Sequence, residues 1–331
     1  MNQIRLATVS DIDQIMDFIN TNWKENHILS RDKDFFIYEH QDDNRINYVI
    51  SLQNNTINGV IGFIKYSNSN SDIATVIWKA LKSNEHPMLG IEIFNYLREH
   101  SDYNMLFSPG INAKTIGIYN YLDIYTNYLE QFIMINRNYK NFNILKLEES
   151  IVLKNIKFTN NDRYKLLKLK KNQVNFNFDK KEFIPHKDKS YFIKRYFDHP
   201  IYTYNVYGIY LDEEIISLIV TREIEVNNSK ILRIMDFLGN ENSLEYVSKD
   251  LYEIVVKNNY EYVDFMCFGF DKDILNRAGF DKIDIKSKDI IAPNYFNPFI
   301  QENIKINFMA DTKEIEKLRI CKADGDQDRP N

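Results

Sequence analysis

Cysteine is nearly absent from this 331-residue chain, which contains only Cys267 and Cys321. Cys267 lies in an apolar run typical of a strand, so we do not expect a disulfide framework, and two thiols give no cysteine cage for zinc. A surplus of positive charge is also missing, because 42 Lys and Arg stand against 47 Asp and Glu, a net charge of −5. Nucleic acid is therefore not an expected partner.

Long apolar runs are lacking too. No window approaches the roughly 18 uninterrupted apolar residues that a membrane span requires, and the start Met1–Leu6 has neither the basic nor the apolar region of a signal peptide. We therefore expect a cytoplasmic protein without a membrane span. The composition is 44% hydrophobic and 14% aromatic, which can form a buried core over a length typical of about two domains.

The first 140 residues predict an α+β fold. Strands are expected at Gln3–Ala7, Asn47–Gln53, Gly59–Tyr66, Asp72–Leu81, Tyr103–Ile111 and Asn127–Ile135, and helices after Ser10, around Phe35 to His40, at Ile91–His100 and at Asn112–Tyr121. Antiparallel hairpins then combine with one β-α-β crossover. The pattern predicts a mixed, mostly antiparallel sheet flanked by helices.

The same order of elements returns about 157 residues later, which indicates an internal repeat. The matched segments are Lys33–Ile37 with Lys189–Ile193, Tyr48–Ile64 with Val206–Thr221, and Ile73–Leu81 with Ile231–Gly239. Any two hairpins look alike, but the common offset and shared order favour duplication. We predict a first lobe at 1–140, a connector at 141–186, a second lobe at 187–310 and an acidic C-terminal tail at 311–331.

The segment from Tyr103 to Tyr125 resembles part of the GNAT superfamily of acetyl-CoA-dependent acyltransferases. In that family a strand is followed by Asn, a small residue three positions on, Tyr four further, and then Gly-Phe. Asn112, Thr115 and Tyr119 fill the first three places, and Asp123-Ile124 replaces Gly-Phe. The resemblance implies two tandem GNAT-like lobes, acetyl-CoA as cosubstrate and no metal.

The loop Ser83–Gly90 occupies the place of the family's pyrophosphate loop, although Gly90 is its only glycine. Unpaired N–H groups at the start of the following helix could bind an anion, whereas Pro87 removes one donor, and a glycine kept for packing is the alternative. The resemblance implies that the strand edge 78–81 pairs with the pantetheine amides. The expected cofactor-binding residues are Trp78, Lys79, Ala80, Leu81, His86, Met88, Leu89 and Gly90.

The second lobe is closer to the family at Ala278-Gly279-Phe280 but has Leu275 opposite Tyr119. A leucine cannot protonate a leaving thiolate, whereas a phenol can. The loop Gly239–Ser243 contains Glu241, whose charge would oppose a pyrophosphate. We therefore assign cofactor binding and chemistry to the first lobe and expect the second, degenerate lobe to shape the acceptor site.

Acyl transfer to an amine needs a base for the ammonium proton. His27 is the first candidate, between the first two helices, where the superfamily usually places acceptor-binding residues; a structural role for a lone histidine is the alternative. Glu25 in the same turn is a second candidate base and an expected substrate contact. The predicted catalytic set is His27, Tyr119 as the acid, and Asn112 from the motif.

The last residues place Asp324, Asp326, Asp328 and Arg329 in a short polar segment. Such a segment is either a solvated tail or folds over a ligand, with carboxylates for sugar hydroxyls and Arg329 for phosphate. If it closes over a ligand, deleting 322–331 should leave the fold intact. A similar ending occurs in two-lobed GNAT-like proteins of bacterial surface-polysaccharide pathways.

That resemblance implies an N-acetyltransferase acting on a nucleotide-linked amino sugar for lipopolysaccharide O-antigen or capsule synthesis. A Fem-type aminoacyl transferase and a non-catalytic GNAT-like ligand-binding protein are the alternatives.

Overall fold

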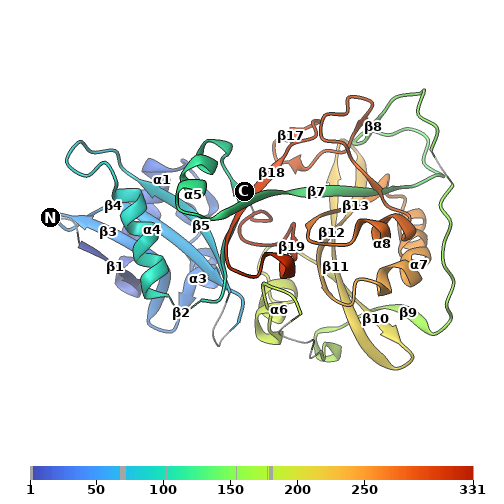
Figure 1. Ribbon diagram of the computed structural model, residues 1–331, viewed down its shortest axis with the longest axis horizontal. Coiled ribbons are helices and arrows are strands. Elements are labelled where there is room, and N and C mark those ends of the chain that lie inside the picture. Colours follow the sequence, from blue (N-terminus) through green and yellow to red (C-terminus); the bar gives the residue numbers. More distant parts are fainter. Residues whose placement is uncertain are drawn as a thin grey trace.

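The computed structural model describes residues 3–67, 72–101, 103–153, 155–176, 178 and 182–330. A 15-stranded sheet runs through both lobes (Figure 1). In spatial order its strands are β1 (Gln3–Thr8), β3 (Arg45–Gln53), β4 (Thr56–Lys65), β5 (Ile73–Ala80), β6 (Leu106–Ile111), β18 (Ile306–Asp311), β7 (Tyr125–Ile135), β13 (Tyr262–Phe268), β12 (Ser229–Gly239), β11 (Glu214–Val226), β10 (Asn205–Leu211) and β9 (Tyr164–Lys168). Three short strands attach to it, β2 (Gln41–Asp42), β14 (Asp281–Lys282) and β19 (Ile320–Cys321).

Two small ribbons lie outside this sheet, β8 (Lys146–Leu147) with β15 (Ile290–Ile291) and β16 (Tyr295–Phe296) with β17 (Phe299–Ile300). The α-helices are α1 (Ile12–Asn22), α2 (Ile28–Arg31), α3 (Lys33–His40), α4 (Leu89–His100), α5 (Ile116–Tyr121), α6 (Lys189–Tyr196), α7 (Ser243–Lys257) and α8 (Lys272–Arg277). Short 3-10 turns occur at Val9–Asp11, Ala113–Thr115, Lys171–Gln173 and Ile315–Lys317. The α+β prediction, with a mostly antiparallel sheet, is confirmed.

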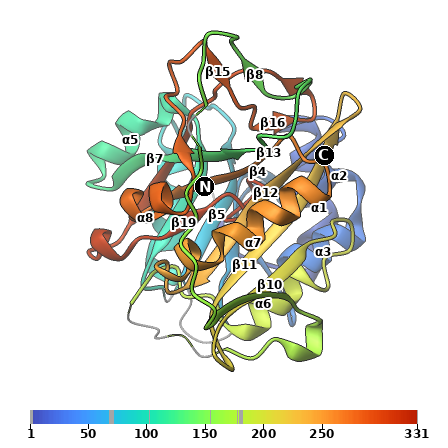
Figure 2. The ribbon, with the colours of Figure 1, turned by 90° about the vertical axis from the view of Figure 1, so that its right-hand side faces the viewer.

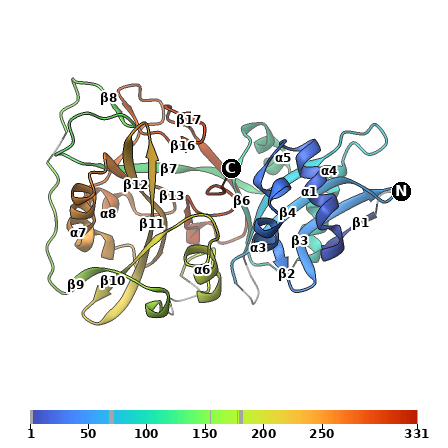
Figure 3. The ribbon, with the colours of Figure 1, turned by 180° about the vertical axis from the view of Figure 1, so that it is seen from behind.

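Helices cover both faces of the sheet. α4 lies in front of the first-lobe strands in Figure 1, and α1 and α3 lie in front of them in the view from behind (Figure 3). In the second lobe α7 crosses the strands (Figure 2). Ile12, Ile15 and Ile19 recur with helical spacing and pack with Tyr48 and Ile50 in one buried cluster. None of the helices in the described ranges is long and apolar enough to cross a membrane.

The duplicated order predicted from the sequence is present. The series α3–β3–β4–β5–α4–β6–α5 recurs as α6–β10–β11–β12–α7–β13–α8. The first helices of the two series even begin alike: Asp32 accepts a hydrogen bond from the Phe35 N–H at 2.9 Å, and Asp188 accepts one from the Tyr191 N–H at 2.8 Å. The same capping chemistry at corresponding positions supports two lobes of common design.

Each lobe completes its sheet with a strand from the other half of the chain. β18, near the C-terminus, pairs with β6 on one side and with residues 125–129 of β7 on the other. The second half of β7, residues 130–135, pairs instead with β13 of the second lobe. β7 therefore runs from one lobe into the other, as Figure 1 shows.

Two segments expected to lie outside the lobes belong to the sheets. β9, within the predicted connector 141–186, is an edge strand beside β10. The predicted tail 311–331 contains β19, which pairs with β13, and the apolar side chains of Leu318, Ile320 and Ala323 are fully buried. The solvated-tail interpretation is therefore wrong, because burial of these side chains holds the segment in the interior.

Candidate functional site

The edge of β5 predicted to bind the cofactor has no strand partner among the described residues where the two parallel strands part. β5 pairs with β6 at Ile73 and Ala74, and this pairing stops there within the described chain although β5 continues to Ala80. On its other side β5 stays paired with β4 as far as Ala80. Main-chain groups of residues 76–80 can therefore accept an added extended chain on the β6 side.

The start of α4 lies next to this edge. The Trp78 indole N–H donates to the Gly90 carbonyl at 3.0 Å, which ties the end of β5 to the first turn of the helix. Met88 precedes the helix without a side-chain cap, and it is half exposed, as Leu81 is in part. Of the other predicted cofactor contacts, Lys79, Ala80 and His86 are partly exposed, whereas Leu89 is buried in the core.

Tyr119 lies close to this edge but inside the core. Its ring is 5.9 Å from that of Trp78 and 6.1 Å from that of Phe94, and 3% of the residue is exposed. Burial raises the pKa of the phenol above its ordinary value, so Tyr119 is protonated at neutral pH, as a proton donor must be. The proton would reach a thiolate only where the cofactor sulfur contacts this buried oxygen.

Asn112 acts as a helix cap. Its side-chain oxygen accepts a hydrogen bond from the Lys114 N–H at 2.9 Å, and its carbonyl accepts one from the Thr115 hydroxyl at 2.7 Å. The predicted helix Asn112–Tyr121 consequently begins as a 3-10 turn at Ala113–Thr115 before α5. The motif position is explained by this local geometry.

His27 also caps a helix. Its Nδ1 accepts from the Leu29 N–H at 3.3 Å at the start of α2. Burial, with added repulsion from Arg329 and Lys24, lowers the pKa of His27 to about 4. The imidazole is therefore neutral at pH 7 but a weak base. Glu25, in the turn before it, is exposed.

The acidic residues predicted to bind the acceptor in the C-terminal segment differ in how far partners within the chain already occupy their carboxylates. Asp328 accepts from Arg222 at 2.5 Å and from the Tyr204 hydroxyl at 2.7 Å. Asp324 forms a buried ion pair with Lys187 at 2.8 Å. Both carboxylates are thus committed to partners within the chain, against the expectation that deleting 322–331 leaves the fold intact.

Asp326 is less committed than Asp324 and Asp328, whereas Arg329 is buried between two carboxylates. Asp326 and Arg329 pair with each other at 3.2 Å, and Arg329 lies 3.4 Å from Glu39 of α3. The Arg329 Nε is buried and has no hydrogen-bond partner among the described residues. This arginine also lowers the pKa of His27 through its charge, which places the two predicted acceptor-side residues in one electrostatic neighbourhood.

The corresponding gap of the second lobe is filled by the chain itself. β12 pairs with β13 at residues 232–234; beyond that point β19 pairs with β13, and the Ala323 N–H donates to the Met235 carbonyl at 2.9 Å. Leu275, opposite Tyr119, is fully buried. Residues 320–323 therefore take the place that an added chain would occupy.

A buried cation lies beside this filling segment. The Lys187 ammonium is 2.6 Å from Asp236 and 2.8 Å from Asp324; burial alone would lower the pKa of Lys187, but the two carboxylates raise it above its ordinary value. Asp236, Cys321 and Asp324 have potential ligand atoms within 4.8 Å of one another. The Lys187 ammonium already balances the charge of the two carboxylates in this group, so their geometry is explained by the ion pairs.

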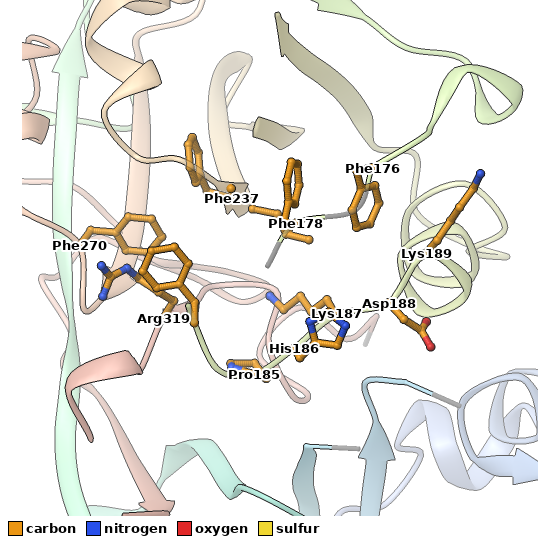
Figure 4. A pocket seen from close by; sticks show the side chains of 13 residues that line it. Phe176, Phe178, Pro185, His186, Lys187, Asp188, Lys189, Phe237, Phe270 and Arg319 are labelled. Atoms are coloured by element: carbon orange, nitrogen blue, oxygen red, sulfur yellow. The ribbon is translucent and has the colours of Figure 1, made fainter. Parts of the chain in front are cut away.

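A cavity that the sequence analysis missed lies at the end of β12 in the second lobe, and we call it the aromatic cavity (Figure 4). It measures about 250 Å³ and is lined by Phe176, Phe178, Phe183, Pro185, His186, Lys187, Asp188, Lys189, Phe237, Leu238, Gly239, Phe270 and Arg319. Eight of these thirteen residues lie between 176 and 189, a stretch that the sequence analysis took largely as connector. Three phenylalanines within this polar stretch were the available signal.

Comparison with solved structures identifies the fold. A GCN5-related N-acetyltransferase from Anabaena variabilis aligns over 94% of this chain and 72% of its own, with a TM-score of 0.55 and 9% identity. One from Kribbella flavida aligns over 94% and 70%, with a TM-score of 0.51 and 9% identity. This chain has the GCN5-related N-acetyltransferase fold. No family model and no curated protein matches the sequence.

These alignments span both lobes, so the likeness covers the duplicated architecture and not a single lobe. The predicted fold, drawn from the Asn112–Tyr119 motif and from the repeat, is confirmed. The assignment of individual site residues remains a prediction.

Proposed function

We propose that this chain is an N-acyltransferase that takes its acyl group from acetyl-CoA bound by the first lobe. The observation that carries the proposal is the end of β5–β6 pairing at Ala74. It leaves residues 76–80 without a strand partner on the β6 side, in the described part of the chain, next to the start of α4, which has no side-chain cap. Unpaired main-chain amides can hydrogen-bond to the amides of a pantetheine chain, and the N-terminus of a helix can bind a pyrophosphate.

The choice of lobe rests on a difference between the two gaps. Residues 320–323 fill the second gap, and Glu241 lies on the loop before α7. Both helix starts carry acids, Glu85 and Glu92 at α4 and Glu245 at α7, so the acids alone do not separate the lobes. No strand of the described chain fills the first gap as β19 fills the second, although Gln327 of the C-terminal segment donates to the Pro109 carbonyl of β6. The first lobe therefore offers the better place for a pyrophosphate.

The acceptor ammonium must lose a proton before its nitrogen attacks the thioester carbonyl. The C–N bond forms, the C–S bond breaks, and the departing thiolate takes up a proton; Tyr119 is our candidate for that donor. With its pKa lowered to about 4, His27 is a poor acceptor for the ammonium proton, so we propose that this proton passes to solvent before the attack. His27 then serves as a hydrogen-bonding neighbour of the neutral amine.

For the acceptor we propose a nucleotide-linked amino sugar, bound between α2–α3 and the C-terminal segment. Asp326 and Arg329 are the residues that support this. Arg329 has a buried Nε without a partner among the described residues, and a guanidinium binds phosphate oxygens well. A role in surface-polysaccharide synthesis follows from this choice of acceptor.

The test is binding followed by turnover. Acetyl-CoA at 100 times its dissociation constant should stabilise the protein by about 2.7 kcal/mol, visible as a raised melting temperature. Release of free CoA thiol should then depend on an added amino sugar nucleotide. Acetyl-CoA binding without thiol release would favour the non-catalytic alternative, which the burial of Tyr119 supports, and no binding at millimolar concentration would reject the proposal.

A further inference from the structure

The aromatic cavity of the second lobe has no part in the proposed acyl transfer, and its walls differ sharply in chemistry. Figure 4 shows phenyl rings on one side, among them Phe237 and Phe178, facing His186 and Lys187 on the other, with Arg319 at one end. We propose that this cavity binds a small ring-containing carboxylate.

The volume sets the size of the ligand. A closed apolar cavity of about 150 Å³ holds one benzene molecule, so about 250 Å³ has room for roughly ten non-hydrogen atoms. That is one aromatic ring with a short side chain. A nucleotide or a whole cofactor would extend from it into solvent.

The ring content of the ligand follows from the walls. Phe176 and Phe178 stack with ring centres 5.0 Å apart, and Phe237 meets Phe270 edge to face at 5.8 Å. Phe176, Phe178 and Phe270 remain partly exposed, so ring surface is left for a guest, and aromatic rings attract one another beyond the area that they bury. A flat ring therefore fits these walls better than a flexible chain.

The carboxylate follows from Arg319. Its guanidinium lies 4.3 Å from the Phe183 ring and 5.4 Å from the Phe270 ring, so it is positioned by the same side chains that line the cavity. One carboxylate, Glu241, is 3.2 Å from it, and one N–H donates to the Leu318 carbonyl. A guanidinium has five N–H donors, which leaves capacity for a second carboxylate.

The other charges at the cavity favour a single negative charge. Lys187 is already paired with two carboxylates and adds no free positive charge. Lys189 is exposed at the opposite end from Arg319 (Figure 4). Asp188, also in the lining, caps α6 by accepting from the Tyr191 N–H at 2.8 Å, and its negative charge opposes additional anionic groups. Arg319, partly neutralised by Glu241, therefore matches a monoanion better than a phosphate or a dicarboxylate.

The test compares two probes of one shape, trans-cinnamate and its neutral amide, by isothermal titration with the full chain. Wild-type protein should bind cinnamate about tenfold or more tightly than cinnamamide, because a hydrogen bond to a charged group is stronger than one to a neutral group. Arg319→Leu should remove that preference and leave cinnamamide binding nearly unchanged. Arg163→Leu is the matched control, since Arg163 pairs with Asp212 on the exposed edge of the same lobe.

A second variant tests the place of binding. Leu238 lines the cavity and is only half buried, so Leu238→Trp should fill the cavity and abolish binding of both probes without unfolding the chain. Equal affinity for the two probes, or undiminished binding to Leu238→Trp, would overturn the proposal. If acetyl-CoA displaced cinnamate, the aromatic cavity would not be a separate site and the proposal would be overturned. If acetyl-CoA did not bind to the protein at all, the proposed acyl transfer would fail, but cinnamate binding with the expected preference would still support this proposal.

Discussion

Gly90→Asp is the sharpest test of where the cofactor binds. Gly90 is the second residue of α4, and a Cβ added there would lie 3.7 Å from both the Ala80 Cβ and the Trp78 Nε1, which are ordinary contacts. The new carboxylate would therefore fit without strain at the proposed pyrophosphate position. Two unit charges about 6 Å apart repel by about 0.7–2.8 kcal/mol at effective dielectric constants of about 80–20, so acetyl-CoA affinity should fall about tenfold.

The fold itself should not suffer from this change, because an acidic residue in the first turn of a helix is stabilising. Gly90→Ala separates the charge from the added carbon and should bind nearly as well as wild type. Gly117→Asp is the matched control: Gly117 is the second residue of α5, and a Cβ there meets nothing within 4 Å. Titration calorimetry measures the three dissociation constants, and an unchanged value for Gly90→Asp would refute the site.

Three further expectations concern other parts of the chain. Tyr119→Phe should lower turnover by about 10²–10⁴-fold with acetyl-CoA affinity unchanged; unchanged turnover in steady-state kinetics would leave Tyr119 only a core role. Asp328→Asn should cost about 3–5 kcal/mol in urea unfolding because it leaves Arg222 unpaired in a largely buried position, whereas Asp212→Asn, which breaks an exposed pair, should change little. The pKa of His27 is lowered to about 4 in the folded state, so the unfolded chain binds more protons between about pH 6.5 and 4. The free energy of unfolding should therefore decrease as the pH is lowered through that range. Melting curves of His27→Gln should show a smaller decrease, and an identical one would contradict the lowered pKa.

Local features of the fold could be predicted from the sequence because they depend on neighbouring residues. The β3–β4 hairpin turns at Asn54 and Asn55, which adopt φ of 52° and 63°, a conformation that asparagine tolerates. The helix α3 and its counterpart α6 follow from a capping aspartate and the aromatic residues behind it. The internal repeat could be recognised because these signals return in the same order.

The course of the C-terminal segment could not be predicted in this way. β18 enters the first lobe through contacts with residues some two hundred positions away, such as the pair Arg98–Asp311 at 2.8 Å, and nothing in its own composition indicates this partner. Asp324 and Asp328 looked like solvent-exposed acids because their partners, Lys187 and Arg222, are remote in sequence. The aromatic cavity could not be predicted for the same reason, since its walls come from four separate parts of the chain.

The crossed pairing of β18 and β7 makes the two halves of the polypeptide interdependent during synthesis. Until residues 306–311 have left the ribosome, β6 and the first half of β7 lack the strand that lies between them. Likewise β13 needs residues 130–135, made long before it. A gene divided at the boundary between the lobes would therefore yield two fragments, each of which lacks a strand that the other fragment contains. Either fragment alone should expose unpaired strand edges and aggregate, whereas the two fragments expressed together should reassemble.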